Sequence, residues 1–190
     1  MLRKKSIFAV TLTAALVAGA VMLPGNAYAA KKKKVLVAYF SVTGTTKDAA
    51  KQVQKGTGGK LYRITPKKAY SQADIDYTND SCRANKEQRN SKSRPKVKGK
   101  VKKIRSYDVI FVGYPIWHGK EPKVVKTFLE SYNLKGKKIV PFCTSGGSGI
   151  SGSIKGIKAS AKGAKVVSGK DLTNLSNKSI RKWAKKKVKK

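Results

Sequence analysis

Apolar positions along the chain form five runs that predict β-strands. The most continuous are residues 35–40 (VLVAYF), 107–115 (YDVIFVGYP) and 137–144 (KKIVPFCT), whose nearly unbroken apolar character is typical of strands buried on both faces of a parallel sheet. Less continuous runs over 60–66 (KLYRITP) and 164–169 (AKVVSG) predict two more strands.

Between the strands, apolar residues recur at helical spacing. The helices expected over residues 47–59 and 121–132 each have one apolar face, formed by Ala49, Ala50 and Val53 in the first and by Val124, Val125, Phe128 and Leu129 in the second. Weaker helical patterns cover 153–163 and 177–188. Because strands that alternate with crossover helices pair in parallel through right-handed connections, the prediction is a three-layer α/β domain.

The segment from Lys67 to Lys100 interrupts this alternation. It is polar, rich in Asn, Ser and Arg, and has little apolar periodicity. One interpretation places a helix from Ser71 onwards, but most of the segment is predicted to be an excursion away from the sheet, either ordered or flexible.

The first 29 residues have the pattern of an export signal peptide. Basic residues at 3–5 precede an apolar run over 7–23, and small residues lead to a cleavage position after Ala29. A transmembrane anchor is the alternative, but the run contains two threonines and is shorter than the ~20 apolar residues that span a bilayer. We expect an exported protein, extracellular or associated with the cell surface, with a single domain over residues 30–190.

The composition adds a large excess of positive charge. The sequence has 44 Lys and Arg against 9 Asp and Glu, a formal net charge of +35, and removal of the three cations in residues 1–29 leaves +32. Such a surface attracts polyanions, so we expect loose retention on anionic wall polymers or lipid head groups rather than a dedicated polyanion site. Self-repulsion favours a monomer. Aromatic residues are not interleaved with the lysines, which argues against a specific nucleic-acid partner.

The cysteines and the histidine do not suggest a metal site. The spacing of Cys82 and Cys143 matches neither a metal knuckle nor a redox dithiol, and one histidine with scattered acids supplies no ligand set. Cys143, at the end of an apolar strand, is expected to be a small buried side chain. Export makes a disulfide between the two cysteines an alternative, and the less expected one.

Three loops with unusual chemistry follow predicted strands, at residues 41–46 (SVTGTT), 115–119 (PIWHG) and 144–149 (TSGGSG). In open parallel sheets, ligands bind beyond the carboxyl ends of the strands, so we expect the loops to meet at one rim. The local pattern supplies nothing to cover the ring of Trp117, which indicates that a ligand covers it.

The first of these loops has the composition of a phosphate-binding site. Four hydroxyls and one glycine precede the amino terminus of a helix, where free amides and the helix dipole favour an anion. The loop lacks the GK[ST] ending of nucleoside-triphosphate loops, so phosphoryl transfer is not implied. An ordinary helix cap of Ser and Thr residues is the alternative.

These residues resemble the flavodoxin family. The first loop is similar to the S-x-T-G-x-T phosphate-binding signature of flavodoxins, and residues 113–149 resemble one flavodoxin-like branch. The intervening DYTNDSCRANKEQRNSKSRPKV resembles that branch too, including Arg83, Arg94 and Pro95. The resemblance extends from about Val35 to Trp183.

The resemblance implies a five-stranded sheet of order 2-1-3-4-5 that binds FMN. The first loop would bind the phosphate, the second would flank the isoalloxazine ring, with FMN covering Trp117, and the third would line its other edge. The implied residues are Ser41, Val42, Thr43, Gly44, Thr45 and Thr46, then Pro115, Ile116, Trp117, His118 and Gly119, then Thr144, Ser145, Gly146, Gly147 and Gly149.

Two features depart from the family. Related sequences often carry a second tryptophan at the position of His118, and flavodoxins are typically acidic, whereas this chain is basic. His118 is either an exposed loop residue without a role or a proton donor near the reduced flavin.

Three functions are compatible with these features. The first is an exported FMN protein that carries electrons to or from a redox partner protein or a quinone. The second is an FMN-dependent reductase of quinones or nitro compounds that uses NAD(P)H, and the third is a cationic surface-binding protein with a vestigial flavin fold. No nucleotide-binding fingerprint is visible beyond the FMN loops, which favours the carrier.

Overall fold

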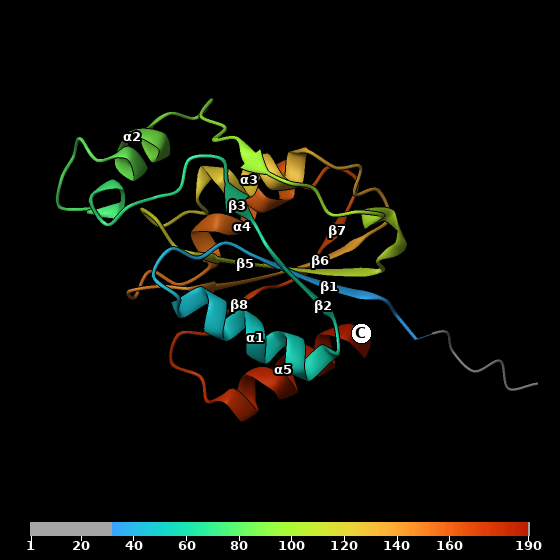
Figure 1. Ribbon diagram of the computed structural model, residues 1–190. Coiled ribbons are helices and arrows are strands. Elements are labelled where there is room, and N and C mark those ends of the chain that lie inside the picture. The colour runs from blue at the N-terminus through green and yellow to red at the C-terminus, as the bar shows by residue number, and fades with distance from the viewer. Residues whose placement is uncertain (1–31, 190) are drawn as a thin grey trace, which may run out of the picture. The chain divides into compact units, whose positions relative to one another are not determined.

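The predicted strands and helices are present in the computed structural model, which describes residues 32–189 (Figure 1). The expected signal peptide over residues 1–29 lies outside the described residues and stays a prediction. No helix within residues 32–189 has both the length and the apolar character needed to cross a membrane.

A parallel sheet forms the middle layer. Its strand order is β2-β1-β5-β6-β7, and the short β8 also pairs with β6. The strand bounds are β1 Val35–Tyr39, β2 Lys60–Arg63, β5 Val109–Pro115, β6 Lys138–Thr144, β7 Lys165–Val166 and β8 Lys170–Asp171. Since β7 and β8 pair with the same side of β6, they occupy the fifth position together, and the predicted order 2-1-3-4-5 is confirmed.

The fifth strand is broken because of a proline in its neighbour. The carbonyls of Ile139 and Cys143 accept hydrogen bonds from Val167 N (3.0 Å) and Leu172 N (2.9 Å) on this outer edge. Pro141 lies midway between them in β6 and has no N–H to donate to the same edge. The pairing is interrupted at that point, between β7 and β8.

Two helices cover each face of the sheet. Figure 1 shows α1 (Thr45–Thr57) and α5 (Asn177–Lys189) on one face, and α3 (Lys123–Glu130) and α4 (Ser151–Ser160) on the other. The predicted apolar positions of α1 and α3 are buried, which confirms both helical faces. The three-layer α/β prediction is therefore confirmed.

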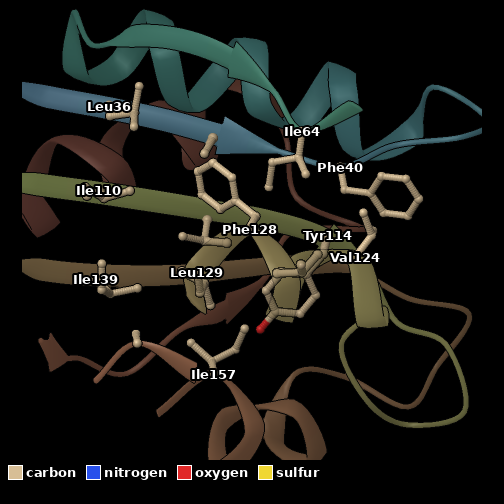
Figure 2. Close-up of a cluster of buried hydrophobic side chains, with 14 of the residues drawn as sticks. Leu36, Phe40, Ile64, Ile110, Tyr114, Val124, Phe128, Leu129, Ile139 and Ile157 are labelled. Atoms are coloured by element: carbon tan, nitrogen blue, oxygen red, sulfur yellow. The ribbon is translucent and has the colours of Figure 1, made fainter. Parts of the chain in front are cut away.

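The core beneath α3 and α4 is built from matching strand positions. Leu36, Ile110 and Ile139 are in register on three adjacent strands, and Figure 2 shows their side chains in one cluster with Phe128 and Leu129 of α3. All five are at most 1% exposed. Full burial of a side chain of this size contributes roughly 1.5–3 kcal/mol to folding stability. This core therefore stabilises the strands from whose ends the three loops extend.

The polar excursion after β2 is ordered. β3 (Thr65–Pro66) directly precedes it and pairs antiparallel with β4 (Val97–Lys98) near its end. Between them lie the 3₁₀ helix η1 (Ala73–Ile75) and α2 (Arg83–Arg89), and η2 (Ile104–Ser106) then leads into β5. Arg94 joins it to α3 through two bonds to the Glu130 carboxylate, of 2.6 and 3.1 Å.

The helix that one interpretation of the sequence placed from Ser71 onwards is present only as the single turn η1. Ser71 and Asp74 exchange backbone and side-chain bonds of 3.0 and 3.1 Å, as at a helix start. Asp76 then accepts from the backbone and hydroxyl of Thr78, which turns the chain away, and the α-helix begins later, at Arg83.

Both cysteines are buried and free, in line with the expected burial of Cys143. Burial, together with the Asp171 carboxylate nearby, raises the pKa of the Cys143 thiol to about 12. Within the described part of the chain, no group of His, Cys, Asp and Glu side chains is arranged to hold a metal ion.

Candidate functional site

The three loops meet at the carboxyl ends of the strands, around a cavity of about 290 Å³. Its walls include the first loop, the start of the second and the start of the third, together with two residues that the sequence did not indicate, Ile75 and Thr173. The predicted site residues that line it are Ser41, Val42, Thr43, Thr45, Thr46, Pro115, Ile116, Trp117, Thr144, Ser145 and Gly146.

The amino terminus of α1, whose first residues Thr45 and Thr46 line the cavity, is open. Its N-cap is Gly44, which has no side chain to accept from the first-turn amides. Ser41 Oγ instead accepts from Gly44 N at 3.2 Å and closes the loop before the helix. Uncapped amides at a helix start, beside the exposed residues Thr43 and Thr45, are groups that can bind a phosphate or another anion.

A buried hydrogen bond joins the first loop to the third. Thr46 and Thr144 are 6% exposed or less, and their hydroxyl oxygens lie 2.7 Å apart. Thr46 therefore links two loops in addition to lining the cavity. Nearby, the Arg63 guanidinium lies 3.4 Å from the carbonyl oxygen of Ser41, which places an unpredicted cation next to the anion site.

Ser145 organises the glycine-rich third loop. Its Oγ accepts from Gly147 N (3.3 Å) and Gly149 N (3.1 Å) and donates to Asp171 at 2.6 Å. Partial burial opposes ionisation of Asp171, but hydrogen bonds from Ser145 and Thr173 outweigh it and hold the pKa of this carboxyl below its usual range. Gly147 and Gly149 thus shape the loop and do not line the first cavity.

Gly146 has no structural requirement to be glycine. Its φ lies outside the left-handed region, and a Cβ built on it would meet no protein atom within 4 Å. Each of the other described glycines has either a left-handed φ or a Cβ position blocked by a neighbour. Gly146 also lines the cavity, so the absence of a side chain leaves the wall of the cavity open at this position.

The second loop is a two-residue turn. Trp117 and Lys120 exchange backbone hydrogen bonds of 2.9 and 3.0 Å, and the central residues His118 and Gly119 have φ of 49° and 69°. Positive φ at both positions is the conformation of a type I′ turn.

The turn is held on two sides. Gln88 of α2 donates to the carbonyls of Trp117 (2.9 Å) and Glu121 (3.2 Å). On the other side, α4 approaches so closely that a Cβ on Gly152 would lie 2.3 Å from the carbonyl oxygen of Gly119. The position of the turn is therefore fixed by two helices.

Protein side chains cover part of the Trp117 ring, for which the local sequence pattern indicated no protein cover. Phe40 and Tyr70 contact the indole edge-to-face, with ring centroids 5.5 and 5.2 Å away. Tyr70 belongs to the polar excursion, whose fold was not predictable from periodicity. The indole stays half-buried and lines the cavity with the rest of its surface.

A second cavity of about 500 Å³ adjoins the first. The two share Ile75, Ile116, Trp117 and Gly146. The predicted residues His118 and Gly119 line this second cavity and not the first, together with four residues of the excursion that the sequence did not indicate, Ile75, Tyr77, Ala84 and Asn85.

One carboxyl group near the turn is buried without a cation. Glu121 is 5% exposed, and no Lys or Arg nitrogen in the described residues lies within 4.0 Å of its carboxylate. Its carboxyl packs against α4, where a Cβ on Gly156 would lie 1.9 Å from Oε1. Burial raises the pKa of Glu121.

Comparison with known proteins agrees with this geometry. The sequence profile of the flavodoxin family matches residues 34–187. A solved structure from Bacteroides eggerthii, assigned as a flavoprotein, is 44% identical, with a TM-score of 0.76 over 80% of this chain and 95% of that one. A similar assignment from Bacteroides uniformis is 40% identical, with a TM-score of 0.77 over 82% and 99%.

A more distant likeness supports the fold alone. The flavoprotein of Lactobacillus acidophilus, crystallised in complex with FMN, is 23% identical, with a TM-score of 0.61 over 80% of this chain and 99% of that one. Among curated proteins, no sequence matched this chain.

Proposed function

The chain belongs to the flavodoxin family, and from this premise we propose that it binds FMN in the first cavity and carries electrons between redox partners. Family membership supports a flavin cofactor and a redox function. FMN, when bound, supplies one- and two-electron chemistry, while the protein supplies binding, orientation and electrostatic field.

The residues present suit the groups of FMN. The uncapped amides of α1, with Thr43 and Thr45, are placed to hold the phosphate, and Arg63 adds positive charge beside them. Trp117 offers an aromatic surface for the isoalloxazine ring, worth about 1 kcal/mol beyond its buried area. Gly146 leaves backbone amides free to approach the polar edge of the ring.

The observation that carries the proposal is that one cavity is lined both by the loop at the open amino terminus of α1 and by the half-buried indole of Trp117. The test is titration of the apoprotein with FMN and, in parallel, with riboflavin. We expect quenching of flavin fluorescence by both, with FMN the tighter ligand because only FMN has a phosphate. Absence of both quenching and heat of association with excess FMN would overturn the proposal.

A reductase that uses NAD(P)H to reduce quinones or nitro compounds is the second candidate. The observation that favours it is the second cavity, because a pure electron carrier needs no space for a substrate beside its flavin. Steady NAD(P)H oxidation that depends on an added quinone would distinguish the reductase from the carrier.

We further propose that the protein is exported and held loosely on anionic wall polymers or lipid. The pattern of residues 1–29 supports export, and the charge of +32 on residues 30–190 (35 − 3) supports the association. Helix α5 alone carries seven Lys and Arg and no acid. We expect the processed chain, beginning after Ala29, in the cell-surface fraction of an exporting host, released by salt. Retention of residues 1–29 or resistance to salt would contradict this.

A further inference from the structure

We propose that the second cavity is a binding pocket for small planar carbonyl compounds of the quinone class, and that His118 donates a proton to their carbonyl oxygen. The inference rests on the proposed function, because it takes the first cavity as the flavin site. It assigns a substrate class to the second cavity and a role to the single histidine of the chain.

The walls of the second cavity suit a flat aromatic molecule. Apolar side chains of Ile75, Ala84 and Ile116 and the rings of Tyr77 and Trp117 line it. Its volume of about 500 Å³ is within the range of pockets for small ligands. Because Trp117 and Gly146 line both cavities, a molecule in the second would lie directly beside one in the first.

Tyr77 stands at this pocket with most of its surface free. It is 79% exposed, and no other large hydrophobic side chain in the described residues is classed as exposed. An exposed tyrosine beside a cavity offers a stacking surface that folding itself does not use.

His118 lies at a turn position that is usually occupied by a different type of residue. Both central positions of a type I′ turn need positive φ, and Asn, Asp or Gly usually fill them. His118, with φ 49°, is one of only two described non-glycine residues in the left-handed region. A residue kept in a disfavoured conformation beside a cavity indicates a role for its side chain.

Asn85 determines which imidazole nitrogen is available. Its amide nitrogen donates to the carbonyls of Tyr77 (3.2 Å) and Asn79 (2.9 Å), and since carbonyls only accept, the orientation of the amide is fixed. The remaining Asn85 oxygen hydrogen-bonds His118 Nε2, which must therefore carry a proton. Nδ1 is the nitrogen left for a ligand.

This arrangement matches the proton requirement of quinone reduction. Conversion of a quinone to a hydroquinone takes up two electrons and two protons. FMN, once reduced by a reduced nicotinamide or by dithionite, would supply the two electrons and one of the protons together as a hydride. The second proton comes from solvent through Nδ1 of His118, which takes it up and donates it to the carbonyl oxygen, while Nε2 keeps its own proton in the bond to Asn85.

The single histidine provides a direct test by NMR of protein labelled with ¹⁵N-histidine and loaded with oxidised FMN. We expect one set of imidazole resonances, with a proton on Nε2, and a shift of the Nδ1 resonance when anthraquinone-2-sulfonate is added. With FMN bound, no shift of Nδ1 at saturating quinone, or a proton on Nδ1 alone, would overturn the pocket while the proposed function stands. Failure of FMN itself to bind would overturn both.

Two variants complete the test. His118→Asn keeps a residue that favours the left-handed region, so the turn is retained while the imidazole is lost. With dithionite-reduced protein, we expect quinone reduction at least tenfold slower in His118→Asn, and quinone affinity at least threefold weaker in Tyr77→Ala, where the exposed ring is removed without a packing change. Thermal unfolding confirms that each variant is folded, and wild-type rates and affinities in both would refute the assignment.

Discussion

Replacement of Gly146 by alanine separates folding from ligand binding at this site. Gly146 has an unstrained φ, and the added methyl group would contact no protein atom within 4 Å. Gly→Ala at such a position stabilises a protein by about 0.4–1 kcal/mol, because the unfolded chain loses conformational freedom. The methyl group would also be added at a residue that lines the cavity proposed for FMN.

We expect Gly146→Ala to raise stability and lower affinity together. If the flavin lies against the loop, the methyl group must displace it, and a loss of about 1.4 kcal/mol corresponds to a tenfold weaker Kd. Gly147→Ala is the matched control on the neighbouring residue. Its φ of 132° is a backbone conformation that residues with a side chain rarely adopt, so this variant should lose stability.

The assay is urea unfolding of both apoproteins, followed by FMN titration monitored by flavin fluorescence. An unchanged FMN affinity in Gly146→Ala would refute the reasoning that a ligand needs this position free. Lower stability in Gly146→Ala would refute the structural part of the argument.

Three further predictions concern charged and buried groups. Glu121→Gln should raise the urea midpoint at pH 7, because burial raises the pKa of Glu121 in the folded state and its ionised form therefore destabilises the fold. The gain in stability of the variant over the wild type should grow as the pH rises above about 4.3, the pKa of an unfolded glutamate, and vanish below that pH. Cys143 should resist iodoacetamide at pH 8 in the native protein and react in urea, since its pKa is raised to about 12; native labelling, read by mass spectrometry, would contradict its burial. Arg94→Ala should cost about 1 kcal/mol by losing its two-bond pair with Glu130, whereas Arg89→Ala, from a more exposed pair, should leave urea unfolding unchanged; equal effects would refute the distinction.

The sheet was predictable because its strands are continuous apolar runs. The apolar composition of three segments indicates strands buried on both faces: residues 35–40, 107–115 and 137–144. The connections between them are long enough for crossover helices, which implies that the strands pair in parallel. The break in the fifth strand was not predictable from that strand itself. It follows from Pro141 in the neighbouring strand, and a single-strand pattern does not report on the partner.

The rim of the site was predictable in part. Hydroxyls and glycines after apolar strands indicated the three loops, and topology brought them together. The walls from the excursion were missed because they depend on polar side chains such as Asn85 and Gln88, which bond to backbone groups distant in sequence. These bonds leave no periodic pattern, and neither does the contact of Tyr70 with Trp117.

The two outer edges of the sheet bear on resistance to aggregation. One edge is β2, which is four residues long, begins with Lys60 and ends with Arg63. The other is the divided pair β7 and β8, two residues each, which begin at Lys165 and Lys170. An incoming strand from another molecule would meet short ladders and a row of cations. The apolar strands at the centre are thus shielded from edge-to-edge assembly into fibrils.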